Sequence, residues 1–392
     1  MTVTGRIPFL VVGGGIGGLA TALAIARTGR PVHVLEQAPE FAEIGAGLQV
    51  GANATRAMSR LGIFDDVREV SVFPRAGVLM DAVTGERLTA LDTGTSYVDR
   101  FGHPYLVMHR SDLLDILLKH CTETGLVTLE NDKSVVHAEV HAGGATVGCA
   151  DGTAYTCDAL IAADGLHSRL RRLIRDDKPV CSGYAACRGT VPIGQVADVD
   201  VDDVVIWIGP GMHLVQYPVR RGELYNQVAV FHSPRLSAGG SEWGGPGELD
   251  AAFAQACAPV RKSVSLVNRD RHWPMFDREP LDRFVHGRLA LMGDAAHPML
   301  QYLGQGACQA LEDAVELGLQ LDRHDVDTAF AGYERRRLPR ATRCQRTARP
   351  WGEIWHTADP LTRAVRNRMF QLRAPDDYTD VDWLYADPEG RA

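Results

Sequence analysis

The sequence lacks the features of a membrane-spanning, disulfide-stabilised or nucleic-acid-binding protein. No apolar run approaches the ~18 residues that a membrane-spanning helix needs. The eight cysteines are scattered and none forms a CxxC pair, so we expect reduced, mostly buried thiols and no metal site. Acidic residues outnumber basic ones by 49 to 41, a net charge of −8, which argues against a nucleic-acid or anionic-membrane partner. Residues 1–7 contain no signal-peptide core, so we expect a cytoplasmic protein.

A strand–helix–strand unit is predicted at the N-terminus. Residues 9–12 and 32–35 are short apolar runs, and apolar residues recur at helical spacing between them. The first turn, GGGIGG, contains the GxGxxG motif of dinucleotide sites. Gly13 permits the tight turn, Gly15 lets the backbone approach a pyrophosphate, and Gly18 allows close helix–strand packing. Glu36 ends the second strand and can accept hydrogen bonds from a ribose diol; the alternative is a unit without a ligand.

Two further motifs follow predicted strands. Residues 160–163 run into DGLHSRLR (164–171), which fits DGxxSxxR. Residues 289–292 run into GDAAHP (293–298), followed by GQG (304–306) and a predicted helix over 307–321. Each motif alone could be a turn, but all three in this order indicate a parallel sheet whose carboxyl edge holds a ligand.

The remaining chain has a different character. Residues 186–233 are rich in Val, Ile and aromatic residues, and they predict antiparallel strands of a second, β-rich domain extending to about residue 285. Residues 237–247 predict a loop. From residue 333 onward, arginines punctuate a helical stretch, for which we expect a solvated helix face, with contact to a partner subunit as the alternative.

On these motifs the sequence resembles the class A flavoprotein aromatic hydroxylases. The resemblance covers roughly residues 5–345 and includes Tyr105, HRSDL (109–113) and YER (333–335). It implies an α/β fold in which a Rossmann-type (GR2) FAD-binding domain (1–75, 105–180 and 285–330) is interleaved with a β-rich substrate domain (76–104 and 181–284). A C-terminal helical segment (331–392) completes it.

The resemblance also implies a set of FAD contacts. The helix after Gly306 would aim its positive end at the flavin and stabilise the reduced anion by roughly 0.3–1 kcal/mol. The implied cofactor-binding residues are Gly13, Gly15, Gly18, Glu36, Gln37, Gly47, Arg110, Val136, Asp164, Asp294, Pro298, Gly304, Gly306 and Ala307.

A substrate wall is predicted in the β-rich domain. Residues 209–218 form a turn and a strand, and alternation places His213, Val215 and Tyr217 on one face. His213 and Tyr217 would lie roughly 13 Å apart, so that their side chains could bracket a benzene ring. The resemblance is closest here to the 3-hydroxybenzoate 6-hydroxylases, which make gentisate. It implies His213, Tyr217 and Gln301 as catalytic residues and adds Tyr105 to them as substrate contacts; structural roles remain the alternative.

One position departs from the family pattern. Many relatives carry an aromatic residue where this chain has Cys187, before Arg188-Gly189, which leaves the exact substrate open. No histidine lies near Cys187 in the sequence, so we do not expect a nucleophilic cysteine.

The implied reaction uses NADH (or NADPH) and molecular oxygen as co-substrates of the FAD. NAD(P)H reduces the flavin, and oxygen then adds at C4a to give a hydroperoxide that attacks the ring. A base that removes the phenol proton makes the ring a better nucleophile, and the ordinary pKa of histidine suits His213 to this task. The chain has no second GxGxxG, so NAD(P)H is expected to bind transiently. We also expect a homodimer.

Other functions stay open at this point. A decarboxylating salicylate 1-hydroxylase or a hydroxynicotinate hydroxylase would use the same motifs. A nucleotide-binding regulator would show no turnover, and a flavin reductase acting on an isoprenoid would need no oxygen.

Overall fold

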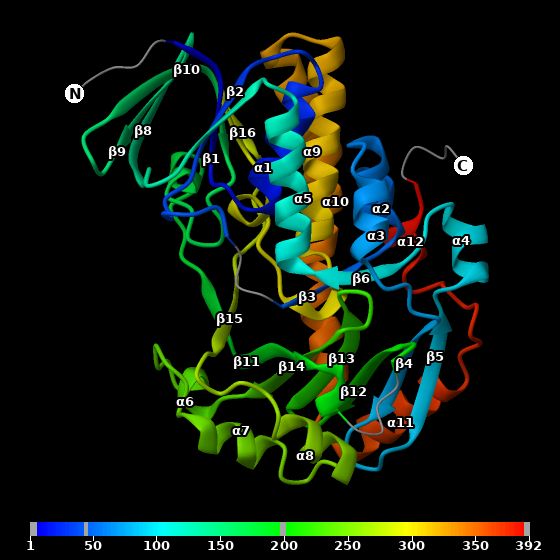
Figure 1. The fold of residues 1–392 in the computed structure, drawn as a ribbon. Helices are drawn as coiled ribbons and strands as arrows, with labels where there is room; N and C mark the ends of the chain where they lie inside the picture. Colours follow the sequence, from blue (N-terminus) through cyan, green and yellow to red (C-terminus); the bar gives the residue numbers. More distant parts are fainter. Residues whose placement is uncertain (1–5, 43–45, 197–200, 388–392) are drawn as a thin grey trace.

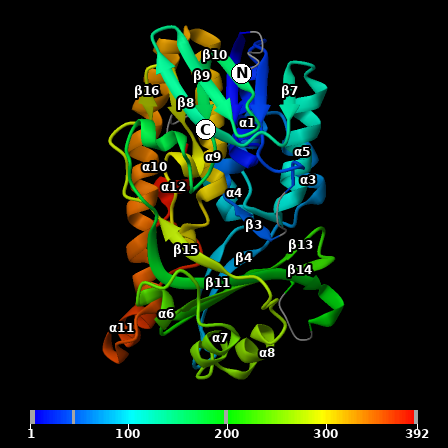
Figure 2. The same cartoon turned by 90° about the vertical axis from the view of Figure 1, so that its left-hand side faces the viewer.

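The computed structural model describes residues 6–42, 46–196 and 201–387. Two large β-sheets lie toward opposite ends of the molecule, and the long helix α10 (Val326–His356) runs from one to the other, as Figures 1 and 2 both show. Within the described parts of the chain, no helix combines the length and apolar character that crossing a bilayer requires.

The first sheet has eight strands and is built around the N-terminal unit. Its path runs β16-β17-β10-β1-β2-β7, with β9 on β10 and β8 on β9, and β1 pairs with both β2 and β10 in parallel. Parallel strands are covered on both faces, which suits the apolar run of β1 and the apolar second half of β10, residues 159–162. The strands are β1 (Ile7–Val12), β2 (Val32–Leu35), β7 (Val127–Glu130), β8 (Val135–His141), β9 (Gly144–Cys149), β10 (Ala154–Ala162), β16 (Val285–His286) and β17 (Leu289–Leu291).

Three helices complete this half of the molecule. Helix α1 (Ile16–Ala26) packs between α5 (Arg110–Glu123) and α9 (Gly306–Arg323), and ten of its residues are buried. A helix that is apolar on all sides needs such neighbours all round. The predicted strands at 32–35, 160–163 and 289–292 and the predicted helix at 307–321 are therefore confirmed to within a few residues.

The second sheet has seven strands in the order β15-β11-β14-β13-β12-β4-β5. Neighbours from β11 to β12 are antiparallel, which confirms the prediction for residues 186–233, whereas β12 pairs with β4 in parallel. The early pair β4–β5 thus joins strands from much later in the sequence. The strands are β4 (Ala76–Asp81), β5 (Arg87–Asp92), β11 (Val180–Pro192), β12 (Val204–Gly209), β13 (Met212–Val219), β14 (Leu224–His232) and β15 (Trp273–Asp277).

One face of this sheet carries helices that the sequence did not predict. Figure 1 shows α6 (Pro234–Ser237), α7 (Pro246–Ala252) and α8 (Ala258–Val264) beneath β11, β13 and β14. Trp243 and Phe253 pack there against Phe231 of β14. The predicted loop at 237–247 holds for most of its length, since α6 ends at Ser237 and α7 begins at Pro246.

Smaller elements connect the two halves. Strands β3 (Gly47–Val50) and β6 (Leu106–His109) form a two-stranded sheet between them. The other helices are α2 (Ala52–Arg60), α3 (Phe64–Val70), α4 (Thr95–Phe101), α11 (Pro360–Gln371) and α12 (Asp382–Tyr385). The 3-10 turns are η1 (Leu170–Leu173), η2 (Ile193–Gln195), η3 (Gly293–Ala295) and η4 (Gln301–Leu303).

The expectation of a solvated arginine face on the C-terminal helix is wrong for Arg337. Its side chain is 4% exposed, and its Nε donates to Asp313 Oδ1 at 2.7 Å. Arg337 also pairs with Glu312, which a second arginine, Arg340, contacts as well. A buried arginine must be paired, so helix α10 is fixed against α9 by ion pairs that no periodicity of charge revealed.

Candidate active site

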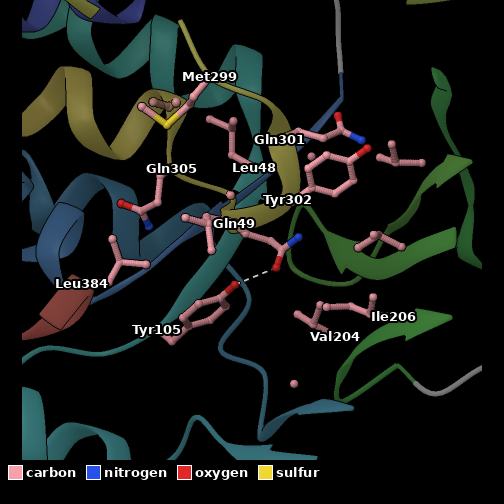
Figure 3. Close-up of a pocket in the computed structure, with 18 of the residues that line it drawn as sticks. Leu48, Gln49, Tyr105, Val204, Ile206, Met299, Gln301, Tyr302, Gln305 and Leu384 are labelled. Carbon is pink, nitrogen blue, oxygen red and sulfur yellow. Dashed lines mark hydrogen bonds between the residues drawn. The ribbon is translucent and has the colours of Figure 1, made fainter. Parts of the chain in front are cut away.

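A cavity of about 520 Å³ lies where the two sheets face each other. Residues from both halves and from the C-terminal segment line it (Figure 3). Predicted site residues that the structure brings together on its wall are Gly15, Gly47, Tyr105, Arg110, His213, Tyr217, Asp294, Gln301, Gly304, Gly306 and Ala307. Sequence motifs more than 200 residues apart therefore meet at one place.

The glycine loop after β1 has the tight geometry that its motif predicts. Gly13 has a φ of +110°, and a Cβ there would lie 2.2 Å from the carbonyl oxygen of Ala163. A Cβ on Gly18 would lie 1.8 Å from the carbonyl oxygen of Gly13. Only glycine fits at either position, and the amide end of α1 thereby opens onto the cavity at Gly15.

Glu36 holds this loop from the next strand. Its Oε2 accepts a hydrogen bond from the amide of Gly14 at 2.6 Å, and its Oε1 accepts one from Ala38 at 2.8 Å. Glu36 also lines a second cavity of about 330 Å³ that Gly15 and Arg110 share. The carboxylate is thus in place beside the loop, while Gln37 is exposed on its outer side.

The DG motif (residues 164–171) ties its own loop to the GD loop, the loop of the GD motif (residues 293–298), at the edge of the sheet. Asp164 Oδ2 accepts from the amide of Arg169 at 2.9 Å, whereas its buried Oδ1 has no hydrogen-bond partner among the described residues. Burial raises the pKa of Asp164. The last residue of the motif, Arg171, is fully buried and donates to the carbonyl oxygens of Ala295 and Ala296 at 3.2 and 2.7 Å. Its role here is to fasten the DG loop to the GD loop.

The GD motif presents a carboxylate at the floor of the cavity. Asp294 lies deep in the protein but faces the open cavity, and burial raises its pKa although Arg110 and His297 oppose the shift. Helix α9 begins at Gly306, as predicted, and its first turn lines the cavity. The amide of Gly293 donates to Asp313 Oδ2 at 2.9 Å, so the motif is attached to the helix it precedes.

These features fit FAD. The amino ends of two helices, α1 and α9, open onto one cavity and offer amides to phosphate oxygens. A loop without room for a Cβ leaves the backbone accessible. A buried carboxylate oxygen of Asp164 without a partner is the kind of group that a polar ligand satisfies.

Strand β13 forms the opposite wall, as its alternation predicts. His213, Val215 and Tyr217 all line the cavity and are 1%, 7% and 2% exposed. The ring of Tyr217 packs closely on the backbone of Gly47, a predicted FAD contact, since a Cβ on Gly47 would lie 2.4 Å from that ring. Gln301 enters from η4, beside Tyr302, as Figure 3 shows. Aromatic and amide groups thus surround a space beside the GD loop.

Tyr105 is placed differently from the other predicted substrate contacts. Its hydroxyl donates to Gln49 Oε1 at 2.7 Å (Figure 3). Burial raises its pKa well above the usual range. Tyr105 is therefore a neutral, anchored phenol at the edge of the cavity.

The surroundings of His213 move its pKa away from the intrinsic value of histidine. Burial, with a smaller contribution from His356, lowers the pKa of His213 well below its usual value. His213 Nδ1 lies 2.7 Å from Nε2 of His356, the last residue of α10. The sequence carried no signal for His356, because 143 residues separate the two histidines.

The C-terminal segment supplies other residues that the sequence did not predict. Trp355, Phe370 and Arg373 line the cavity. Arg373 Nη2 is buried without a hydrogen-bond partner among the described residues, and so is Thr89 Oγ1 on β5. Both donors face the same cavity.

Some predicted residues lie away from the two cavities described above. Val136 on β8 is 44% exposed, and Pro298 is buried with its carbonyl oxygen accepting from Gln345 Nε2 at 2.9 Å. Cys187 is fully buried, and burial raises its pKa to about 11, which keeps it a thiol. Within the described ranges, no cluster of three His, Cys, Asp or Glu residues is arranged to hold a metal ion.

Comparison with known proteins places the chain among flavoproteins. Residues 6–348 match the family model described as FAD binding domain. The chain is 40% identical to a 3-hydroxybenzoate 6-hydroxylase of Polaromonas naphthalenivorans (strain CJ2), over 97% of this chain and 96% of the relative. A 3-amino-4-hydroxybenzoate 2-monooxygenase of Streptomyces cremeus is 35% identical, over 98% and 96%. Klebsiella pneumoniae HpxO, solved with FAD and uric acid, superposes with a TM-score of 0.86 at 27% identity, covering 98% of both chains.

Proposed function

This chain belongs to the FAD-binding-domain family, and on that premise we propose that it is a flavin-dependent monooxygenase of 3-hydroxybenzoate. The product is 2,5-dihydroxybenzoate, and NADH and oxygen are the co-substrates. One observation carries the proposal: His213, Tyr217 and Gln301 share a cavity with the GD loop and the amino end of α9. Relatives named for hydroxylation of hydroxybenzoates, at 35–40% identity over nearly the whole chain, support the substrate class.

In this proposal the residues of the first wall of the cavity would hold FAD. The loop at Gly15 and the amino end of α1 receive the pyrophosphate, and Glu36 holds the adenosine ribose. Arg110 and Asp294 contact the cofactor nearer the flavin. The bound FAD supplies the activation of oxygen, which no side chain of the protein can provide. No bulky side chain crowds the part of the cavity where oxygen would reach the flavin, because the residues there are small: Gly304, Gly306 and Ala307.

The aromatic acid lies against the second wall. His213 accepts the phenol proton, and Gln301 orients the same hydroxyl through its amide. The buried hydroxyl of Tyr217 stays protonated, because burial raises its pKa, so it orients the ring as a hydrogen-bond donor. Ionising the phenol makes the ring carbons ortho and para to the oxygen better nucleophiles.

Arg373 is our candidate for the group that holds the carboxylate. The segment after α11 lies beside β5, where the amide of Asp92 donates to the carbonyl of Pro375 at 2.8 Å. In the sheet, Thr89 of β5 is three strands from β13, about 14 Å away at the usual spacing between strands. An aromatic acid and an extended arginine side chain together can bridge that separation. The half-buried guanidinium of Arg373 lies 3.8 Å from Asp380 on one side, and its Nη2 on the cavity side favours an anionic ligand.

The test is stimulation of NADH oxidation by each isomer of hydroxybenzoate, with identification of the product. We expect 3-hydroxybenzoate to stimulate oxidation and to yield 2,5-dihydroxybenzoate without release of CO2. Catechol and CO2 from 2-hydroxybenzoate, with an inert 3-isomer, would assign the chain to decarboxylating salicylate hydroxylation instead. Turnover of a hydroxynicotinate alone would assign it to pyridine hydroxylation. No NADH oxidation with any hydroxybenzoate would leave a nucleotide-binding regulator, and NADH oxidation that needs no oxygen would leave a reductase.

Other parts of the proposal rest on the sequence. We propose the two sheets as cores of an FAD domain and a substrate domain, with the boundaries given above. NADH in preference to NADPH, a homodimer and a cytoplasmic location remain proposals. Initial rates with the two nicotinamides and the mass in solution test the first two.

A further inference from the structure

His213 is one half of a buried histidine pair. Its Nδ1 lies 2.7 Å from Nε2 of His356, and the two ring planes differ by only 22°. His213 is 1% exposed and His356 is 6% exposed. Because Nδ1 of His213 is used within the pair, Nε2 is the nitrogen that remains for a ligand in the cavity.

The end of helix α10 holds His356 in place. Its carbonyl oxygen accepts from the amide of Gly211 at 3.0 Å, in the turn that precedes β13. Its ring stacks on Tyr184 with centroids 4.5 Å apart. Arg366 of α11 donates to the carbonyl of the preceding residue, Trp355, at 2.8 Å. Contacts from three elements therefore fix the orientation of this ring toward His213.

The pair can move a proton but cannot store one. One of the two facing nitrogens must carry the hydrogen and the other must accept it. Burial lowers the pKa of His213 well below its usual value and that of His356 to about 3, with Arg366 and His232 adding to the second shift. An imidazolium is therefore disfavoured on either ring, so a proton accepted by one ring must leave the pair on the other side.

We propose that His213 and His356 form a two-histidine relay that carries the phenol proton out of the cavity, an inference that rests on the proposed function. The phenol O–H bond breaks as an N–H bond forms at His213 Nε2. The hydrogen on His213 Nδ1 passes to His356 Nε2, and the hydrogen on His356 Nδ1 passes to water. The substrate becomes a phenolate, one proton reaches the solvent, and both imidazoles end neutral in their other tautomers.

The relay makes His356 a positioning residue that acts through His213. It selects the tautomer in which Nδ1 of His213 is protonated and Nε2 is free to accept. It also removes the charge that would otherwise remain on a desolvated ring. Neither task needs contact between His356 and the substrate.

Two substitutions separate passing the proton from holding the ring. His356→Gln retains an amide oxygen that can accept from His213 Nδ1, but an amide does not pass the proton on. His356→Ala removes both functions and leaves space for added imidazole. His324→Gln is the matched control, because His324 is an exposed histidine at the end of α9 that contributes to the pKa shift of neither ring of the pair.

The experiment measures ionisation of bound 3-hydroxybenzoate on the oxidised holoenzyme without NADH, by the phenolate difference spectrum, and then product per NADH in turnover. We expect wild type and His324→Gln to form phenolate at the same rate. His356→Gln and His356→Ala should slow both phenolate formation and kcat by about 10- to 100-fold, at or below the low end of general-base effects, with KM little changed. Imidazole should partly restore His356→Ala alone.

The outcomes distinguish the relay from the proposed function. Wild-type phenolate rate and coupling in both His356 variants would overturn the relay and leave the hydroxylase intact. Phenolate formation that depends on His356 without any hydroxylated product would support the relay and overturn the hydroxylase. Absence of ligand ionisation in the wild type would overturn the relay directly. If both variants misfold, the wild-type rate in mixtures of H2O and D2O decides: a curved dependence supports two protons in transit, and a linear one contradicts them.

Discussion

Replacing Arg337 with Met tests whether helix α10 holds the flavin side of the cavity through buried charge. The substitution keeps the length and apolar stem of the side chain while removing its guanidinium. Glu312 and Asp313 would lose the group that pairs with both of them. Asp313 also accepts from the amide of Gly293 in the GD loop, so the loss reaches a cofactor-binding motif.

The expected magnitude follows from the burial of these groups. Arg337 is 4% exposed and Asp313 is fully buried. Removing one partner of a buried pair costs about 3–5 kcal/mol, because the remaining charge stays desolvated. Arg340 still pairs with Glu312 and His297 still contacts Asp313, so we expect a value near the lower end of that range.

The pH dependence of the stability lost in Arg337→Met is a sharper test than the size of that loss at one pH. Burial alone would raise the pKa of Glu312, but Arg337 and Arg340 hold it at about 2. Arg337 and His297 likewise lower the pKa of Asp313 against its burial. A lowered folded-state pKa stabilises the protein above the unfolded-state pKa of about 4 and loses that effect as the pH falls. Without Arg337 both carboxyls should titrate higher, so the difference from wild type should shrink between pH 7 and pH 5.

The assay is urea unfolding at pH 7 and pH 5, followed by tryptophan and flavin fluorescence with FAD in excess, because bound ligand stabilises the folded state. Arg335→Met on the same helix is the control, since Arg335 is exposed and should change stability by no more than about 0.5 kcal/mol. The reasoning fails if the free energy of unfolding of Arg337→Met lies within about 1 kcal/mol of the wild-type value at pH 7. It also fails if the difference between these two free energies grows as the pH falls.

Three further substitutions address the cavity. Gly18→Ala places a Cβ 1.8 Å from the Gly13 carbonyl oxygen and should abolish FAD binding, whereas Gly247→Ala, with open space around it, should purify yellow; FAD content per chain is the measurement. His213→Ala should retain FAD and slow hydroxylation by about 10²–10⁴-fold, with NADH diverted to hydrogen peroxide; unchanged product per NADH would assign the base elsewhere. Arg373→Met should raise KM for 3-hydroxybenzoate by about 10-fold or more with little change for 3-hydroxybenzamide; equal effects on both would show that Arg373 does not bind the carboxylate.

The sequence predicted the parts of the fold that have local signals. Glycine-rich turns after apolar runs correctly predicted the positions of β1, β10, β17 and the start of α9. Such turns leave a local signal in the sequence, because a backbone such as that of Gly13, with a φ of +110°, favours glycine. Alternation along β13 correctly predicted that His213 and Tyr217 lie on the cavity wall. This signal is also local, because side chains alternate between the two faces of any strand.

Features that depend on contacts between distant segments were not predictable in the same way. Helices α7 and α8 are seven residues each, too short for a clear periodicity. They form because Leu249 of α7 and Val260 and Val264 of α8 pack in the core cluster beside the sheet. The burial of Arg337 depends on α9, and the lowered pKa of His213 depends on His356. A single sequence contains these partners but not the information that they meet.

Helix α10 links these missed features. Arg337 and His356 are 19 residues apart by their numbers, about 28 Å along an α-helix at 1.5 Å per residue. One end of that span is fixed to α9 and the GD loop by buried ion pairs, and the other supplies the ring that faces His213. Since both contacts are made by one continuous helix, the distance between the flavin side and the proton acceptor is set by helix geometry instead of by a loop.

A substitution at Arg337 should therefore disturb the His213–His356 pair as well as FAD binding, whereas a substitution at His356 should leave FAD affinity unchanged. FAD titration of His356→Gln beside phenolate formation in Arg337→Met tests this asymmetry, and equal loss of FAD affinity in both variants would contradict it.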